Sequence, residues 1–381
     1  MKRMRILLVS PYHGGSHEAW AEGYVRHSAH QVNMLTLPAR FWKWRMHGAA
    51  VTLARRFNQS GLSVDRLLVT DMLDLTTFLS LTRDTLARVP TVLYMHENQL
   101  TYPLPAGQNS GPMRRQHGER DLHYAFINYA SMLAADEVWF NSAYHLDAYF
   151  AALPNFLKHF PEYNELGSIS LLRSKSHVYP IGVDFDSLEE GRPAASEETA
   201  AEENPLLLWN QRWEYDKDPE TFFTALEEIA AEGISFRLAL CGQQYGRRPT
   251  VFDAWLASAG ETVIHSGFAD PATYASLLWR ADIAVSTALH EFFGISIVEA
   301  MHANTLPILP NRLSYPEILP AAFHERCLYE DPAGLVQLLK GALNNLAETR
   351  STAAAIAAVT ERYDWRALAP IYDRGLTRVR A

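Results

Sequence analysis

The sequence is poor in cysteine and in long apolar runs. Cys241 and Cys327 are its only cysteines, which excludes a disulfide framework and favours a reducing compartment. No apolar run approaches the roughly 20 residues of a membrane-spanning helix. The N-terminus has basic residues before apolar ones, but Pro11 ends an apolar run of only about five residues, too short for a signal peptide. We therefore expect a cytoplasmic protein without stable membrane insertion.

Cofactor and metal motifs are also missing. Gly14 and Gly15 follow the first apolar segment, yet the remaining glycines of the dinucleotide fingerprint and the Lys-Ser/Thr pair of a P-loop are absent. No His/Cys cluster has zinc spacing. Asp184 and Asp186 form a DxD pattern, but they follow Ile181-Gly182-Val183, which resembles a known interdomain hinge sequence, and this resemblance implies a hinge instead of a metal site. The prediction is no metal and no cofactor.

Acidic residues are absent from one long window, although the formal net charge of the chain is −9. Between Gly23 and Val64 there is no Asp or Glu, and Trp42 and Trp44 alternate with basic residues in ARFWKWRMHG. Basic and aromatic side chains together can hold phosphates and stack on bases, so the window favours a polyanionic acceptor. The alternative is a surface loop whose tryptophans dock on the core. The expected acceptor contacts are Arg40, Lys43 and Arg45.

Two series of alternating strands and helices are predicted, and 381 residues suffice for two such domains. In the first series we expect a turn over 11–17 with Ser16 as helix cap, strands at 5–10, 31–37, 66–70, 91–95 and 137–141, and helices at 73–86 and 121–134. In the second we expect strands at 206–209, 236–241, 262–265, 283–286 and 306–309, and helices at 271–279, 335–346, 351–359 and 363–376. Asp218 and Pro219 should begin a further helix as cap and first residue.

Polar residues follow several predicted strands. His96, Glu97, Asn98 and Gln99 come directly after the strand at 91–95, where ligands bind in parallel α/β sheets. Arg212 and Lys217 lie in the loop after the strand at 206–209, and two cations there can neutralise a diphosphate.

The most informative stretch is STALHEFFGISIVEAMHANTLP, residues 286–307. It places Glu291 and Glu299 on either side of Gly294, where a strand, a loop and a helix follow one another. The backbone N–H groups of Gly294, Ile295 and Ser296 should be the unpaired donors of that helix and form an anion site. A nucleotide sugar, with a diphosphate between two polyhydroxy groups, suits this arrangement. The alternative is an ordinary strand–helix unit with a solvated Glu299.

The same stretch resembles the signature of retaining GT-B glycosyltransferases related to sucrose and glycogen synthases. The matching residues are Glu291, Phe293, Gly294, Glu299, Ala300, Met301 and Pro307. Asn304 replaces the usual Gly, a mild departure because Asn tolerates positive φ. The resemblance implies an α/β fold of two Rossmann-like domains facing a deep cleft, with a C-terminal helix that crosses back to the first domain.

The resemblance also implies domain limits and roles. The limits are an acceptor-side domain at 1–183, a hinge or linker at 184–204, a donor domain at 205–360 and a crossover helix at 361–381. Glu291, Arg212, Lys217 and His96 would be catalytic. The donor would contact Gly14, Gly15, Gly242, Gly294, Ile295, Ser296 and Glu299. The acceptor would contact His17, Glu97, Asn98 and Gln99 in addition to the basic residues at 40–45.

Three N-terminal stretches, PYHGGSHEAW, LPARFWKWRMHG and YMHENQLTYP, are together similar to the tRNA-queuosine mannosyltransferase group. This resemblance implies GDP-mannose as donor and queuosine in a tRNA anticodon as acceptor. Two alternatives remain open. The chain could be a same-fold enzyme that glycosylates a lipid, a polysaccharide or a small molecule. It could also be a nucleotide-sugar or RNA-binding protein without turnover.

Overall fold

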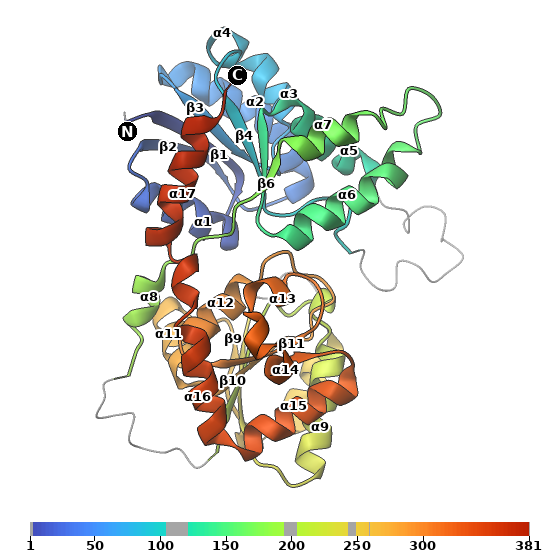
Figure 1. The fold of residues 1–381 in the computed structure, drawn as a ribbon, viewed down its shortest axis with the longest axis vertical. Coiled ribbons are helices and arrows are strands. Elements are labelled where there is room, and N and C mark those ends of the chain that lie inside the picture. The colour runs from blue at the N-terminus through green and yellow to red at the C-terminus, as the bar shows by residue number, and fades with distance from the viewer. Residues whose placement is uncertain (1–2, 104–120, 194–203, 243–248, 259, 381) are drawn as a thin grey trace. The chain divides into compact units, whose positions relative to one another are not determined.

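The computed structural model describes residues 3–103, 121–193, 204–242, 249–258 and 260–380. They form two compact units (Figure 1): Met1–Val183 with Trp365–Ala381, and Asp184–Asp364. The stretch predicted as linker, 184–204, contains a short helix, α8 (Phe185–Glu189). Phe185 and Leu188, three residues apart, lie on one face of this helix, and both are buried. Its remaining part, 194–203, lies outside the described residues.

The first unit is built on a six-stranded sheet. Its strands are β1 (Arg5–His13), β2 (Gln31–Pro38), β3 (Arg66–Thr70), β4 (Thr91–Met95), β5 (Glu137–Phe140) and β6 (Ser176–Val178). They are parallel and ordered β2-β1-β3-β4-β5-β6. The central strand β4 is buried at every position, as expected for a parallel sheet with helices on both faces.

The helices of this unit are α1 (Ser16–His27), α2 (Trp42–Ser60), α3 (Leu75–Leu81), α4 (Arg83–Leu86), α5 (Leu122–Ala134), α6 (Ala143–Leu157), α7 (Ser168–Ser174) and α17 (Trp365–Arg378). The predicted C-terminal helix, α17, packs on the first unit beside α1 (Figure 1). Its Asp373 accepts hydrogen bonds from Tyr24 Oη at 2.8 Å, Ser28 Oγ at 2.7 Å and the Ala29 N–H at 2.8 Å. At its start, the Trp365 N–H donates to the Val183 carbonyl at 3.2 Å.

Three local predictions in this unit are wrong. The chain does not turn at Pro11, because β1 continues to His13, whose carbonyl accepts from the Ala39 N–H at 3.1 Å. The turn is therefore confined to Gly14 and Gly15, and Gly15, with a φ of 57°, caps α1 in place of Ser16. The helix expected over 73–86 is broken at Thr82 into α3 and α4.

The second unit is built on another parallel sheet. Its strands are β7 (Leu206–Asn210), β8 (Arg237–Cys241), β9 (Val263–Gly267), β10 (Ile283–Val285), β11 (Leu306–Pro310) and β12 (Leu328–Tyr329). The order β12-β11-β10-β7-β8-β9 starts at β7 in the middle and proceeds outwards in both directions, which is the doubly wound Rossmann order. Around it lie α8, α9 (Pro219–Ala231), α10 (Thr250–Ser258), α11 (Pro271–Arg280), α12 (Ile295–His302), α13 (Tyr315–Ile318), α14 (His324–Cys327), α15 (Pro332–Asn344) and α16 (Leu346–Ala357).

Local sequence signals worked well in this unit. Asp218 caps α9 by accepting from the Thr221 N–H, and Pro219 is the first residue of the helix, as predicted. Asn304 has a φ of 60°, the left-handed conformation that its amide side chain tolerates.

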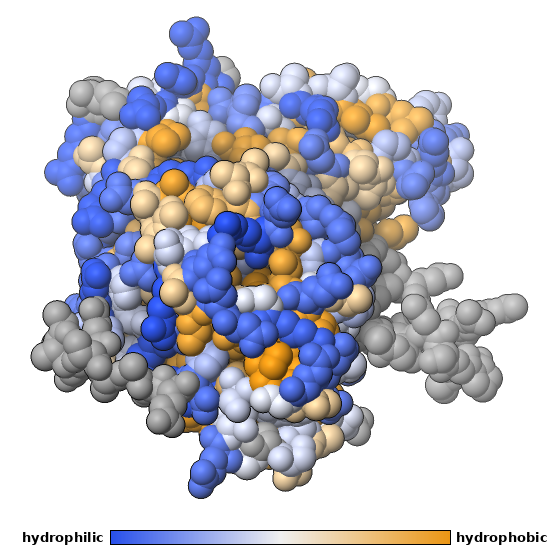
Figure 2. Space-filling view, turned by 60° about the horizontal axis from the view of Figure 1, so that its bottom comes forward, coloured by the Kyte–Doolittle hydropathy of each residue, from blue (hydrophilic) through white to orange (hydrophobic). Residues whose placement is uncertain are grey.

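The outer surface shows no single apolar zone in the view of Figure 2, where hydrophilic and hydrophobic residues are interspersed on the visible face. Within the part of the chain that the structure describes, no helix combines the length and the hydropathy needed to cross a membrane.

Candidate functional site

The second sheet has a topological switch point between β7 and β10. The two strands pair directly, although the chain leaves them towards opposite edges of the sheet. Ligands of open α/β sheets bind at the carboxyl ends of the strands at such a point. The loop after β7 carries Arg212 and Lys217, and the segment after β10 carries Glu291.

Lys217 places a buried positive charge at the switch point between β7 and β10. It belongs to a 3-10 turn, Tyr215–Lys217, that precedes α9. Its Nζ donates to the His290 carbonyl at 2.7 Å and lies 3.3 Å from Glu291 Oε2 and 3.5 Å from Asp216 Oδ2. The structure thus brings Lys217 and Glu291 together, and it adds Asp216, which the sequence analysis did not identify.

Arg212 lies on the exposed side of the same cluster, with 40% of its side chain exposed. Its guanidinium is 2.8 Å from Glu214 Oε2 and 3.7 Å from Asp216 Oδ2. Asp216 is buried beside both cations, so the two positive charges share one carboxylate. Burial raises the pKa of Glu214, while Arg212 opposes the shift.

Glu291 is held as an anion. Its Oε1 accepts from the N–H groups of Phe292 at 3.1 Å and Phe293 at 3.3 Å. Burial alone would raise the pKa of Glu291, but the neighbouring charge of Lys217, together with the hydrogen bonds from the Phe293 N–H and from Lys217, lowers it below the ordinary value. One carboxylate oxygen is therefore fixed by the backbone and the other faces Lys217.

Glu299, on α12, has a different environment. Its Oε2 accepts from the Tyr274 hydroxyl at 2.7 Å, and that hydroxyl accepts from Asn210 Nδ2 at 3.2 Å. Asn210 also donates to the Ser296 carbonyl at 2.7 Å. Burial raises the pKa of Glu299 to about 7 in spite of the Tyr274 hydrogen bond. No pattern in the sequence marks Tyr274, because its contact with Glu299 is made by the packing of α11 against α12.

The start of α12 is shaped as the sequence predicts. Gly294 is its N-cap with a φ of 96°, a conformation that favours glycine. The Ile297 and Val298 N–H groups both donate to the Gly294 carbonyl, so Ile295 and Ser296 form the first turn. Gly242, at the end of β8, has no room for a side chain, because an added Cβ would lie 2.3 Å from the Gln211 carbonyl oxygen and 2.4 Å from Trp213.

In the first unit, His17 and His96 form a buried pair at the carboxyl ends of β1 and β4. Their ring centroids are 4.2 Å apart, and Trp20 packs edge-on against His96 at 4.7 Å. Burial and the neighbouring His13 lower the pKa of His17 to about 4, and burial lowers the pKa of His96 well below its ordinary value. Both imidazoles are therefore neutral at pH 7. Within the described residues, His96 Nε2 has no hydrogen-bond partner.

Polar residues that the sequence analysis missed hold the loop of His96. The His96 N–H donates to Asp71 Oδ1 at 2.9 Å, and Asn141 Nδ2 donates to the His96 carbonyl at 2.9 Å. His145 Nδ1 lies 2.8 Å from Asn141 Oδ1. Burial, together with the charge of Glu97, raises the pKa of Asp71. Its position directly after β3 is the signal that could have identified Asp71.

The three polar residues after His96 differ in their surroundings. Gln99 Nε2 donates to Glu97 Oε1 at 2.8 Å, and both side chains are partly buried. Asn98 is fully buried. Its Oδ1 accepts from the N–H groups of Leu100 and Thr101, and its Nδ2 donates to Thr101 Oγ1. The Asn98 amide is thus fully engaged in shaping its own loop.

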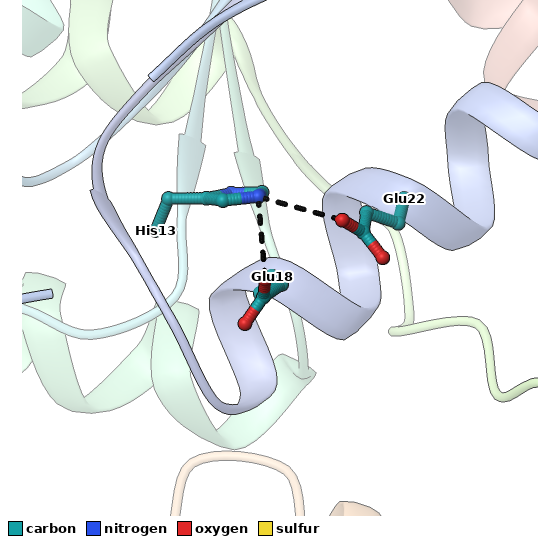
Figure 3. A group of neighbouring side chains, drawn as sticks. All are labelled: His13, Glu18 and Glu22. Carbon is teal, nitrogen blue, oxygen red and sulfur yellow. Dashed lines mark ion pairs between the residues drawn. The ribbon is translucent and has the colours of Figure 1, made fainter. Parts of the chain in front are cut away.

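Beside the Gly14-Gly15 turn lies a group that could hold a metal ion (Figure 3). His13 Nε2 points between two carboxylates of α1, 3.8 Å from Glu18 Oε1 and 3.7 Å from Glu22 Oε1. Among the residues that the structure describes, this is the only set of three His, Cys, Asp or Glu side chains close enough to share an ion. A protonated His13 would pair with both carboxylates without an ion, and the absence of a metal remains a prediction.

The basic window contains helix α2. The alternative considered above is wrong in expecting a loop, because Met46, Ala49, Ala50 and Leu53 give the segment a buried helical face. Its docking of tryptophan on the core is confirmed for Trp42 but not for Trp44, which is exposed. Lys43 Nζ lies 5.6 Å and 5.8 Å from the ring centroids of Trp42 and Tyr124, and Arg45 Nε donates to the Pro38 carbonyl at 3.1 Å. Arg40 is exposed just before the helix.

Comparison with protein families covers most of the chain. Residues 5–183 match the family described as "tRNA-queuosine alpha-mannosyltransferase N-terminal", and residues 192–358 match "Glycosyl transferases group 1". A tRNA-queuosine alpha-mannosyltransferase of Drosophila melanogaster is 30% identical over 319 residues, which are 83% of this chain and 81% of that protein. A GDP-mannose:cellobiosyl-diphosphopolyprenol alpha-mannosyltransferase of Xanthomonas oryzae is 27% identical over 42% of this chain and 43% of its own length.

Solved structures with the same fold include sucrose-phosphate synthase from Thermosynechococcus elongatus. It has a TM-score of 0.75 and 16% identity and covers 99% of both chains. The catalytic domain of starch synthase IV from Arabidopsis thaliana has a TM-score of 0.71 and 11% identity, again over 99% of both chains. The GT-B fold predicted from the sequence is confirmed by these similarities.

Proposed function

Since the chain belongs to the tRNA-queuosine alpha-mannosyltransferase family, we propose that it transfers mannose from GDP-mannose to queuosine in a tRNA anticodon. The cytoplasm, where tRNA is modified and used, is the compartment that this function implies. The observation that carries the proposal for the donor is the buried Lys217 beside Glu291 and Asp216 at the switch point of the second sheet.

The second unit is proposed to bind the donor. Arg212 and Lys217 would hold the diphosphate together with the N–H groups of Gly294, Ile295 and Ser296 at the start of α12. Glu291 would accept hydrogen bonds from sugar hydroxyls, and Glu299 would accept them from the ribose. Because Gly242 has no side chain, Trp213 can pack directly against the end of β8. We therefore propose that Gly242 shapes this site and does not contact the donor.

The first unit is proposed to bind the acceptor. Glu97, Gln99 and His17 would contact the nucleoside, and Gly14 and Gly15 would let the backbone approach a substrate closely. His96, neutral and with Nε2 available, would contact the transferred sugar. For Asn98 we propose support of the loop, because its amide is fully engaged there. Arg40, Lys43 and Arg45 would contact the phosphates of the tRNA.

The reaction breaks the bond between the anomeric carbon and the diphosphate and forms a bond from that carbon to an acceptor hydroxyl oxygen. The hydroxyl proton leaves with the departing diphosphate, and the family implies retention of configuration. Most of the catalysis is then stabilisation of the charge on the leaving group, which Lys217 and Arg212 supply without a resident metal or cofactor.

The test is mass spectrometry of nucleosides from queuosine-containing tRNA incubated with the purified protein and a panel of nucleotide sugars. GDP-mannose alone should yield hexosyl-queuosine, and tRNA that lacks queuosine should yield none. Hexose transfer from another nucleotide sugar would reject the donor. Unmodified queuosine with simultaneous release of nucleoside diphosphate would reject the acceptor, and no release with any sugar would indicate a binding protein.

A further inference from the structure

The start of α2 displays two large aromatic side chains to solvent. Phe41 is 79% exposed and Trp44 is 65% exposed, whereas Met46 and Leu53 of the same segment are fully buried. We propose that Phe41 and Trp44 form a stacking platform for unpaired bases of the anticodon loop. The inference rests on the proposed tRNA acceptor and assigns it binding residues in addition to those around His96.

Phe41 is held in an unfavourable backbone conformation. Its φ of 51° and ψ of 58° are left-handed, a region that bulky residues other than glycine rarely occupy. Phe41 is the N-cap of α2, and its carbonyl accepts from the Arg45 N–H at 3.1 Å. Because the exposed ring gains little from burial, neither packing nor capping requires phenylalanine here. Strain of this kind is characteristic of binding sites.

The indole of Trp44 packs in the space that the absence of a side chain at Gly48 leaves open. A Cβ on Gly48, one helical turn later, would lie 2.6 Å from Cε2 and 2.7 Å from Cζ2 of the indole, so the ring lies over Gly48. One side of the ring is covered by the helix while most of its area stays exposed. A ring that is already ordered loses little conformational entropy when a base stacks on it.

The neighbouring tryptophan behaves differently. Trp42 packs on Tyr124, with ring centroids 5.1 Å apart, and joins a small buried cluster with Met46 and Met72. Both tryptophans alternate with basic residues in the sequence, yet only the side chain of Trp44 is largely exposed to solvent. The structure therefore separates a packing tryptophan from a binding one.

The positive charge around the two exposed rings favours RNA as the partner. From Gly23 to Val64 the chain has no carboxylate, while Arg40, Lys43 and Arg45 flank the two rings. A protein partner or a free sugar does not require such one-sided charge, whereas the phosphates next to each base of an RNA loop do. Sequence-specific RNA recognition uses unstacked bases laid on aromatic side chains, the pairing that two exposed rings among cations provide.

The test compares two acceptors, queuosine-containing tRNA and free queuosine nucleoside, with GDP-mannose as donor. In Trp44→Ala and Phe41→Ala, KM for the tRNA should rise about tenfold each, as for the loss of one stacked base, with kcat unchanged. KM for the nucleoside should change less than twofold. Val51→Ala, which removes another exposed apolar side chain from the same helix (56% exposed), is the matched control and should leave both constants unchanged.

Gly48→Ala tests the preorganisation of the ring. It leaves Trp44 intact but displaces the indole, and it should raise KM for tRNA several-fold without loss of helix content. An unchanged KM for tRNA in Trp44→Ala, or equal weakening for tRNA and nucleoside, would overturn the platform. Should the wild type transfer no sugar to either acceptor, binding of the anticodon arm, measured by fluorescence anisotropy, still decides. Equal affinity of wild type and Trp44→Ala for that RNA would overturn the platform independently of the catalytic proposal.

Discussion

Lys217 is a lysine almost removed from water, with 5% of its side chain exposed. Lys217→Ala removes the positive charge nearest to the proposed diphosphate, and we expect kcat to fall by about a hundredfold or more, as for loss of one key transition-state donor. Initial rates of nucleoside diphosphate release measure the effect. Lys340→Ala, which breaks a surface pair with Glu228 and Glu232 in the same unit, should stay within twofold of wild type. Near-wild-type turnover in Lys217→Ala would remove this residue from the mechanism.

Tyr274 orients Glu299 and helps to keep it ionised. Tyr274→Phe removes a hydrogen bond that lowers the pKa of Glu299, so this pKa should rise from about 7. If Glu299 accepts hydrogen bonds from the ribose hydroxyls as proposed, it does so best as an ionised carboxylate, so donor affinity should fall as the pH drops through about 7 in the wild type. In the variant the loss should occur at higher pH. KM for GDP-mannose as a function of pH measures both profiles, and we expect a several-fold higher KM at pH 7 with kcat nearly unchanged.

Tyr329→Phe is the matched control for Tyr274→Phe. Its hydroxyl donates to the Ser286 carbonyl at 2.9 Å, so the variant also loses one buried hydrogen bond in the same unit. It should lower stability without moving the pH profile. If both variants shift donor KM alike, Tyr274 acts through stability and not through Glu299.

Individual site residues differ in how far the sequence could reveal them. Lys217 and Glu291 are marked by local pattern, because each follows a strand of a Rossmann-like unit. Tyr274 and Asp216 are not, because their significance lies in contacts across the fold: Tyr274 reaches Glu299 from another helix, and Asp216 is recognisable only once both cations are placed beside it.

At the scale of elements, the two aspartate caps of the second unit offer a matched comparison. Asp218 begins α9 and Asp270 begins α11, each followed by proline and each accepting from a threonine N–H and hydroxyl at the third helical position. Substitution by alanine should cost about 1 kcal/mol of stability at Asp270 and more at Asp218, whose left-handed φ of 50° is unfavourable for alanine. Only Asp218→Ala should also lower turnover, several-fold, because Asp218 directly follows Lys217 and its φ of 50° is poorly tolerated by alanine, so the backbone next to Lys217 should shift.

Thermal midpoints and initial rates for the two cap variants check this expectation. Asp218→Asn retains a capping side chain that tolerates the φ of 50° at this position and should recover most of both losses. A fall in turnover of the same size in Asp270→Ala would mean that general destabilisation, and not the Lys217 loop, is responsible.

Elements were predictable where local chemistry determines them. The Asp218-Pro219 start of α9 is one such case. The turn expected at Pro11 was wrong because pairing with β2, a long-range contact, carries β1 on to His13. The break of the predicted helix at Thr82, where the hydroxyl donates to the Phe78 carbonyl at 2.8 Å, has no marked breaker residue in the sequence.

At the scale of the whole molecule, we expect α17 to stabilise the first unit and to have no effect on the stability of the second. Asp373→Ala leaves the buried Tyr24 hydroxyl and the Ser28 and Ala29 donors without their acceptor, and should cost about 3 kcal/mol. Hydrogen exchange followed by mass spectrometry should show faster exchange in α1 and α17 and unchanged exchange in the second unit. Asp147→Ala, which breaks an exposed pair with Arg173, is the control and should have little effect. Faster exchange throughout 184–364 would contradict this assignment.

The bond between the Trp365 N–H and the Val183 carbonyl has a consequence for biosynthesis. The second unit is inserted into the first, and the two points where the chain enters and leaves the insert are adjacent. During synthesis on the ribosome, all of the inserted unit is made before the first residue of α17, so the host unit is the last to be completed. A nascent chain that ends at residue 364 and is held on the ribosome by a flexible C-terminal extension should therefore already bind the proposed sugar nucleotide before α17 can pack on the first unit.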